Sequence, residues 1–137
     1  MNISSRCDYA CRAIVELAQN APKETPLTAT TIAENRNIPE KYLVHIMLQL
    51  KKAGLLTSVR GAQGGYKLAK KSSEITLLDI VVAVDGPLMD PPPCVDESSR
   101  ELQAAWERVA DGTETVLKDI TIQEIVDKAN QSNMYFI

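Results

Sequence analysis

The sequence predicts a mainly α-helical fold that carries one small β-hairpin. Apolar residues recur at helical spacing over most of the 137 residues. The exception is a segment of alternating β-forming residues around a loop with three glycines, Gly61, Gly64 and Gly65. No apolar run approaches the roughly 18 to 20 residues of a membrane span. The first residues also lack the apolar stretch of a secretory signal. We therefore expect a cytoplasmic protein without membrane association.

Three helices are predicted before the hairpin. Apolar spacing indicates the first over about residues 3–20, with Ser4 or Ser5 as its N-cap, and two prolines between residues 21 and 26 end it. Thr28 offers a cap for a short helix over about residues 29–35.

A tight turn over residues 37–39 leads from the short helix into the third helix. Pro39 suits its first position, and Gly54 ends it. Its apolar stripe consists of Tyr42, Leu43, Ile46, Met47 and Leu50. Two helices joined by so short a turn, the second bearing basic residues, are typical of a helix-turn-helix.

The hairpin follows directly and completes a winged helix-turn-helix. Residues 55–60 and 66–69 form its strands, and the glycine loop between them permits positive φ and close backbone approach. Such a wing can lay Arg60 into a DNA minor groove while glycine amides approach phosphates. The alternative, a nucleotide-phosphate loop, is disfavoured because the glycine spacing fits neither the Walker pattern nor GxGxxG.

The second half of the chain begins with a helix over residues 75–86, which we expect to be largely buried. Thr76 and Asp79 have capping-box spacing, and Gly86 marks its end. A proline-rich loop over residues 87–97 holds Cys94 and is interpreted as a linker or sensor segment.

A long amphipathic helix is predicted from Ser98 to Ile120, interrupted only at residues 111–112, and a short helix from Ile122 to Ala129 follows. One apolar stripe on so long a helix is best covered by the same helix of a second subunit, and such a two-fold dimer would read a pseudo-palindromic DNA site. The predicted dimerisation residues are Leu102, Ala105, Trp106, Val109, Val116, Leu117 and Ile120.

These elements define three segments. We expect a DNA-binding winged helix-turn-helix domain over residues 1–86, the linker or sensor loop over 87–97, and a dimerisation segment over 98–137 whose last helix packs back on the core.

Charge is segregated along the chain. Residues 1–71 carry 11 Lys and Arg against 5 Asp and Glu, a net charge of +6, whereas residues 72–137 carry 4 against 13, a net charge of −9. A basic front half suits a polyanion partner, although solvated lysines on a polar face would give the same count.

Over nearly its whole length the chain resembles the IscR/NsrR/CymR-type winged-helix regulators. The resemblance implies a homodimeric transcription regulator, usually a repressor, with the wing and recognition helix on DNA and a long crossed helix at the dimer interface. The residues that carry it are Tyr9-Ala10, Ile38, Lys41-Tyr42-Leu43, Leu50 to Leu56, Ser58 to Gly61, Gly64 to Ala69, Ile75-Thr76, Ala83 to Gly86, Trp106 and Ile120 to Ile122.

The resemblance also implies DNA contacts. It places them on Pro39, Glu40, Lys41, Tyr42, His45 and the wing residue Arg60; with Thr28, Gly61, Gly64 and Gly65 these form the predicted DNA-binding set. One departure concerns Val44, because the IscR branch has a carboxylate there, so the operator of that branch does not transfer. His45 is open to a second interpretation, as a metal ligand, but we favour DNA contact.

The three cysteines raise the question of a sensor. Cluster-binding relatives place three cysteines in the loop before the dimerisation helix, and this chain retains only Cys94, so the standard iron–sulfur site is absent. Cys7 and Cys11 share one face of the first helix, and some relatives use a helix-one side chain at the position of Asp8. Three alternatives stay open: a composite thiolate metal or cluster site across the dimer, redox-active thiols, or cysteines without a sensing role.

The leading functional hypothesis is a DNA-binding regulator that responds to a redox, metal or metabolic signal. We expect no enzyme, because no Cys/His or Ser/His/Asp set supports catalysis. The alternative is a protein-interaction module in which the acidic C-terminal half binds a protein partner and DNA binding is minor.

Overall fold

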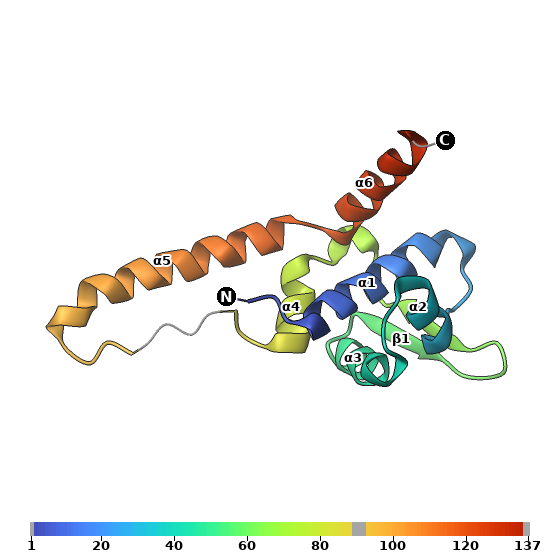
Figure 1. Ribbon diagram of the computed structural model, residues 1–137, viewed down its shortest axis with the longest axis horizontal. Helices are drawn as coiled ribbons and strands as arrows, with labels where there is room; N and C mark the ends of the chain where they lie inside the picture. The colour runs from blue at the N-terminus through green and yellow to red at the C-terminus, as the bar shows by residue number, and fades with distance from the viewer. Residues whose placement is uncertain (1, 89–92, 136–137) are drawn as a thin grey trace.

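The computed structural model describes residues 2–88 and 93–135, with side chains up to residue 132 (Figure 1). Residues 89–92 of the predicted linker loop and residues 136–137 lie outside the described part. The elements are α1 (Ser5–Asn20), a 3-10 turn η1 (Ala21–Lys23), α2 (Ala29–Arg36), α3 (Glu40–Lys52), β1 (Leu56–Val59), β2 (Gly65–Leu68), a second 3-10 turn η2 (Ser72–Glu74), α4 (Leu77–Asp85), α5 (Glu97–Asp119) and α6 (Ile122–Tyr135).

Helix α1 forms the centre of the core. Its residues Ala10, Ala13 and Ile14 are completely buried, and it packs against α2, α3, α4, α6 and β2. Ile122 and Val126 of α6 belong to the same apolar cluster. The C-terminal helix therefore packs on the core, whereas α5 extends away from it (Figure 1).

Local capping fixes where several helices begin. The Ser4 hydroxyl accepts a hydrogen bond from the Cys7 amide at 3.0 Å, and Thr28 accepts one from the Thr31 amide at 3.1 Å. Thr76 and Asp79 form the predicted reciprocal capping box at the start of α4.

The hairpin is antiparallel, with Leu56 opposite Leu68 and Val59 opposite Gly65. It is joined to the segment before α2 by a bridge between Leu27 and Tyr66, whose amides and carbonyls pair at 3.1 and 2.7 Å. Gly65 permits this approach, because its φ is +151° and a Cβ there would lie 2.4 Å from the Leu27 carbonyl oxygen. The wing is thus attached to the start of the helix-turn-helix.

Three details of the sequence prediction were wrong. Helix α5 runs unbroken through Asp111 and Gly112, since one glycine costs a helix only about 1 kcal/mol relative to alanine. Helix α6 continues to Tyr135 instead of ending at Ala129. Helix α4 is less buried than expected, because Val82 is 50 % exposed.

None of the described helices combines the length and the apolar character needed to cross a membrane.

Candidate nucleic-acid interface

Helix α3 divides its side chains between the core and solvent. Leu43, Ile46, Met47 and Leu50 are completely buried. The opposite stripe has the i, i+3, i+4, i+7, i+11 spacing of one helix face, and all its members are exposed. It consists of Lys41, Val44, His45, Leu48 and Lys52. Because the opposite face of α3 is packed in the core, the exposed stripe is held in a fixed position facing solvent.

The first turn of α3 gathers the predicted contacts at its N-terminal end. Pro39 precedes the helix as its N-cap residue. The Lys41 ammonium lies 5.1 Å from the centre of the Tyr42 ring, a cation–π arrangement that holds a positive charge beside an exposed phenol. Glu40 is less free, because the Thr30 hydroxyl of α2 donates a hydrogen bond to its carboxylate at 2.7 Å.

The wing tip is built by glycine. Gly61 has a φ of +109°, and a Cβ on Gly64 would lie only 2.2 Å from the Val59 carbonyl oxygen. The Gly64 amide donates to the Gly61 carbonyl at 3.0 Å, which closes a turn immediately after the exposed Arg60. The Lys51 ammonium of α3 donates to the Ser58 hydroxyl of β1 at 2.8 Å, joining recognition helix and wing.

Two further contributors, Arg6 and Gln49, were missed by sequence reasoning. The Arg6 guanidinium donates to the Gln49 side-chain oxygen at 2.5 Å, which places a cation from α1 beside the exposed stripe. A hollow of about 370 Å³ lies beside this pair, with the two cationic residues Arg6 and Lys52 in its wall. Its lining is Arg6, Tyr42, His45, Leu48, Gln49 and Lys52. Only the tertiary packing of α1 on α3 reveals this group.

Arg36, by contrast, does not belong to the basic surface. Its guanidinium donates to the Glu16 carboxylate at 2.6 Å and to the Gln19 side-chain oxygen at 2.5 Å, and its side chain is 26 % exposed. Asn35 donates to the same Glu16 carboxylate at 3.0 Å. This charge fastens α2 to α1, so Arg36 does not add to the exposed basic surface.

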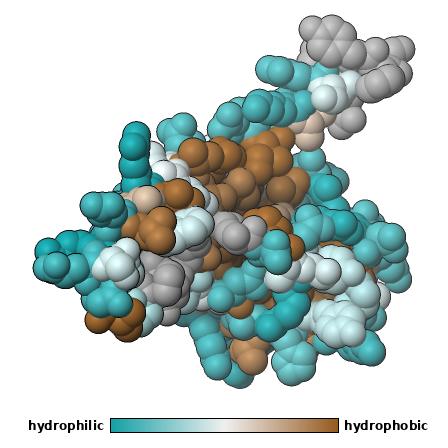
Figure 2. Space-filling model, turned by 60° about the vertical axis from the view of Figure 1, so that its left-hand side comes forward, coloured by the Kyte–Doolittle hydropathy of each residue, from teal (hydrophilic) through white to brown (hydrophobic). Residues whose placement is uncertain are grey.

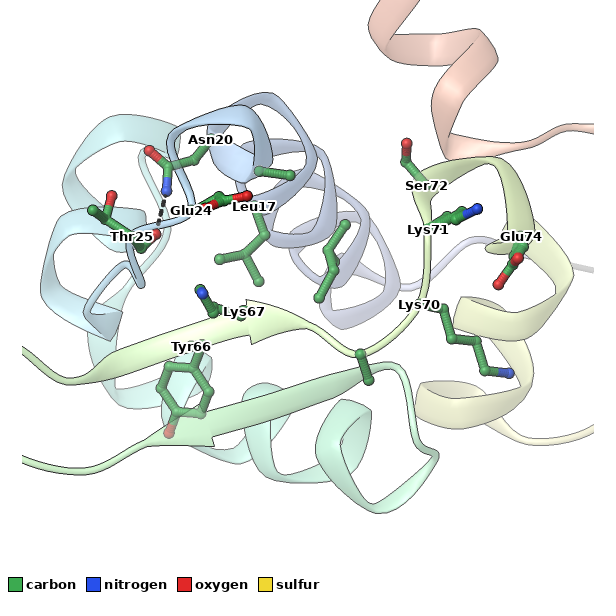
Figure 3. Close-up of a pocket in the computed structure, with 13 residues that line it drawn as sticks. Leu17, Asn20, Glu24, Thr25, Tyr66, Lys67, Lys70, Lys71, Ser72 and Glu74 are labelled. Atoms are coloured by element: carbon green, nitrogen blue, oxygen red, sulfur yellow. Dashed lines mark hydrogen bonds between the residues drawn. The ribbon is translucent and has the colours of Figure 1, made fainter.

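A second hollow, of about 460 Å³, lies between the C-terminal end of α1 and β2 (Figure 3). Lys67 rises from β2 towards Leu17, and the Asn20 amide donates to the Thr25 carbonyl at 2.7 Å across its rim. Its lining mixes lysines with Glu24 and Glu74. This mixed charge separates it from the exposed stripe on α3, which carries Lys41 and Lys52 and no carboxylate.

Helix α5 exposes most of the predicted dimerisation residues, whereas Leu117 and Ile120, which follows the helix, are half-buried. None of its residues is buried, and Leu102, Trp106, Val109 and Val116 are 44 to 61 % exposed. Helix α5 packs against α4, and apolar side chains gather in one continuous area below the base of the C-terminal helix (Figure 2). This protomer therefore leaves a large apolar surface uncovered.

The cysteines divide into a pair and a separate thiol. Cys7 is 1 % exposed and Cys11 is half-buried beside it on α1. A hydrogen bond from the Cys11 thiol lowers the pKa of Cys7 below its ordinary value, although burial and the Asp85 and Asp8 carboxylates oppose the shift. The same hydrogen bond and burial raise the pKa of Cys11.

Cys94 is exposed, and it precedes α5 at the end of that helix farthest from the core (Figure 1). Within the described residues of one protomer, no three His, Cys, Asp or Glu side chains are grouped so that they could hold a metal ion. Among those described residues, neither His45 nor Asp8 belongs to such a group.

Comparison with known proteins gives one consistent family. The profile described as "Rrf2: Iron-dependent Transcriptional regulator" matches residues 3–128. The chain is 31 % identical to the HTH-type transcriptional regulator CymR of Bacillus subtilis over the full length of both. It is 31 % identical to IscR of Photorhabdus laumondii over 93 % of this chain and 80 % of the relative. The match to an rrf2-like regulator of Rhodobacter capsulatus (38 % identical over 71 % of this chain) spans 65 % of that relative's length.

Solved structures agree. The structure of CymR, described as the global cysteine regulator of B. subtilis, matches with a TM-score of 0.83 at 31 % identity, covering 93 % of this chain and 98 % of that one. The T. potens IscR structure matches with a TM-score of 0.79 at 32 % identity, covering 96 % and 90 %. The predicted winged helix-turn-helix fold is thereby confirmed.

Proposed function

Since the chain belongs to the Rrf2 family of helix-turn-helix transcriptional regulators and is not an enzyme, we propose that it is a homodimeric repressor. It binds a pseudo-palindromic operator in the cytoplasm. The single observation that carries the proposal is the exposed cationic stripe on α3, held rigidly by a buried opposite face and joined to the wing through Lys51 and Ser58.

The stripe and the wing have separate tasks on DNA. Lys41 is suited to a phosphate or a guanine edge and Tyr42 to a phosphate or a thymine methyl, both from the major groove. Arg60, beyond the tight glycine turn, is suited to a narrow minor groove. Arg6 and Lys52 add cations along the same face, so affinity should depend steeply on salt.

Dimerisation is proposed from α5. Its half-exposed apolar seam is too extensive to leave in water, and the same seam on a second copy would cover it with two-fold symmetry. Two recognition helices related by that axis would meet half-sites about one helical turn apart. Repression follows where such a site overlaps a promoter.

The wing gives the most specific test. The full chain is used to select duplexes from a pool randomised over about 30 base pairs, enough for two half-sites. On the selected duplex we expect Arg60→Ala to weaken binding about tenfold or more, since a desolvated arginine contact is worth about 1 to 3 kcal/mol. Fluorescence anisotropy measures the affinity.

Lys128→Ala serves as the control, because it also removes one positive charge, but from α6, where the ammonium lies 3.5 Å from the Glu124 carboxylate. We expect no loss for this variant. Equal affinity of Arg60→Ala and wild type would refute the wing assignment. Failure to enrich any duplex would favour the alternative function, in which the acidic C-terminal half binds a protein partner.

For the signal, the described residues of one protomer do not fit the iron that the family description mentions, because they group no three metal-ligating side chains. A composite site shared between two subunits remains a proposal. The positions of Cys7 and Cys11, four residues apart on one face of α1, instead favour a redox signal. Hydrogen peroxide would convert the two thiols to a disulfide with release of two water molecules.

This role is tested by treating the native protein with hydrogen peroxide. We expect the tryptic peptide of residues 7–12 to lose two hydrogens, and operator affinity to fall about fivefold to tenfold as α1 distorts and the Arg6–Gln49 hydrogen bond is lost. A Cys11→Ser variant should keep its affinity after peroxide. An unchanged peptide, or equal losses in both proteins, would remove the thiol pair from the account.

A further inference from the structure

Two aliphatic side chains occupy the middle of the exposed stripe on α3. Val44 is 54 % exposed and Leu48 is 50 % exposed, and their i, i+4 spacing makes them neighbours on the helix surface. Neither contributes to the core, which α3 fills from its opposite face. Their apolar surface is therefore available to whatever covers this face.

The surroundings identify the chemistry of that partner. Lys41 and Lys52 lie at the two ends of the stripe, His45 lies beside Val44, and Arg6 is held against the same face by Gln49. The nearest carboxylate on α3, that of Glu40, already accepts the Thr30 hydroxyl. A partner that matches this face must combine negative charge with small apolar groups.

The major groove of DNA has this combination. Phosphates line its rims, and the 5-methyl group of thymine is the apolar feature that its floor presents to a helix. An arginine-rich or carboxylate-free protein surface would match the apolar pair but not the cations around it.

We propose that Val44 and Leu48 form an apolar reading pair that recognises thymine 5-methyl groups in the major groove. The inference rests on the proposed operator binding and adds a base preference to it. Neighbouring side chains at i and i+4 are about 5 to 6 Å apart, against a base-pair rise of about 3.4 Å. The pair therefore selects thymines one or two base steps apart.

The side chains suit this task energetically. Valine has one strongly preferred χ1 rotamer in a helix, so Val44 loses little freedom when it meets a methyl group. Removing one methyl from such a contact should weaken binding about threefold to fivefold, the change expected for one buried methylene. Removing both methyl contacts together should weaken binding about tenfold to twentyfold.

The test replaces thymine by uracil, which removes only the methyl group and keeps base pairing. Affinities of the full chain are measured by anisotropy on the selected duplex, with uracil at single thymines inside the half-sites or at thymines in the flanks. We expect a threefold to fivefold loss at the contacted thymines and none in the flanks. In the Val44→Ala, Leu48→Ala double variant, thymine and uracil duplexes should bind equally.

Both positions are exposed, and alanine is a good helix former, so the double variant should unfold at the same urea concentration as wild type. Thymine and uracil duplexes bound equally by the wild type would overturn this inference while leaving operator binding intact. So would an equal uracil penalty in the double variant. If wild type binds no duplex, the proposed function fails as well.

Discussion

Trp106→Glu is expected to convert the proposed dimer to monomers and to weaken operator binding about a hundredfold or more. Trp106 is 44 % exposed in the protomer and lies between Leu102 and Val109 on the uncovered seam of α5. In the dimer, a carboxylate at this position would be buried against an apolar surface and would lie close to the same carboxylate of the second subunit. Both effects disfavour association. Separated subunits lose the avidity of two linked half-sites, which is worth about 10² to 10⁴ in affinity.

Sedimentation velocity measures the first effect and anisotropy on the selected duplex the second. Ala104→Glu is the matched control, because it introduces the same carboxylate two residues away on the exposed, polar side of α5. We expect this control to remain dimeric. A Trp106→Glu protein that still sediments as a dimer would show that α5 is not the dimer interface.

Gly65→Ala should have a large effect on stability, with a loss of about 3 kcal/mol in the free energy of unfolding. The new Cβ would lie 2.4 Å from the Leu27 carbonyl oxygen, a backbone atom that cannot rotate away, at a φ of +151°. Relieving this clash requires breaking the Leu27–Tyr66 bridge that attaches the wing. Operator affinity should therefore fall together with stability.

Urea unfolding measures the change in the free energy of unfolding. The Gly61→Ala variant separates the strain of a positive φ from the clash with Leu27. Gly61 also has positive φ, at +109°, but a Cβ there meets nothing within 4 Å. Its variant should lose only about 1 kcal/mol from backbone strain. Equal losses at the two positions would contradict a role for the Leu27 contact.

The features that could be predicted from the sequence depend on residues close together in the chain. The capping box of Thr76 and Asp79 and the cap at Thr28 depend on residues three apart, so their spacing alone predicts them. Continuity of α5 was misjudged for the opposite reason. Glycine preference is a weak local signal, and the long helical segments on both sides of Gly112 outweigh it.

Contacts between distant segments were not predictable. Nothing local to Leu27 shows that it pairs with Tyr66, 39 residues later. Likewise, the count of basic residues in the first half of the chain does not show that Arg36 is paired with Glu16 of α1. Arg6 shows the reverse case, because only the packing of α1 brings it next to Gln49 and the recognition helix.

In the candidate site, too, local features were predictable and features set by tertiary packing were not. Periodicity predicted four of the buried residues of α3 correctly, but it wrongly placed Tyr42 on the apolar stripe, since Tyr42 is 48 % exposed. It did not draw attention to Leu48, since an apolar residue on an amphipathic helix is normally assigned to the core. The half-exposed position of Leu48 beside Val44 is a result of the structure.

The salt dependence of operator affinity tests the central claim most directly. Arg6, Lys41, Lys52 and Arg60 of each subunit give eight cations on the duplex, so the logarithm of affinity should fall against the logarithm of salt concentration with a slope of about −7. Affinity should then decrease about ten-thousandfold between 50 and 200 mM salt. A slope near zero, or the absence of any enriched duplex, would contradict the assignment of this surface to DNA.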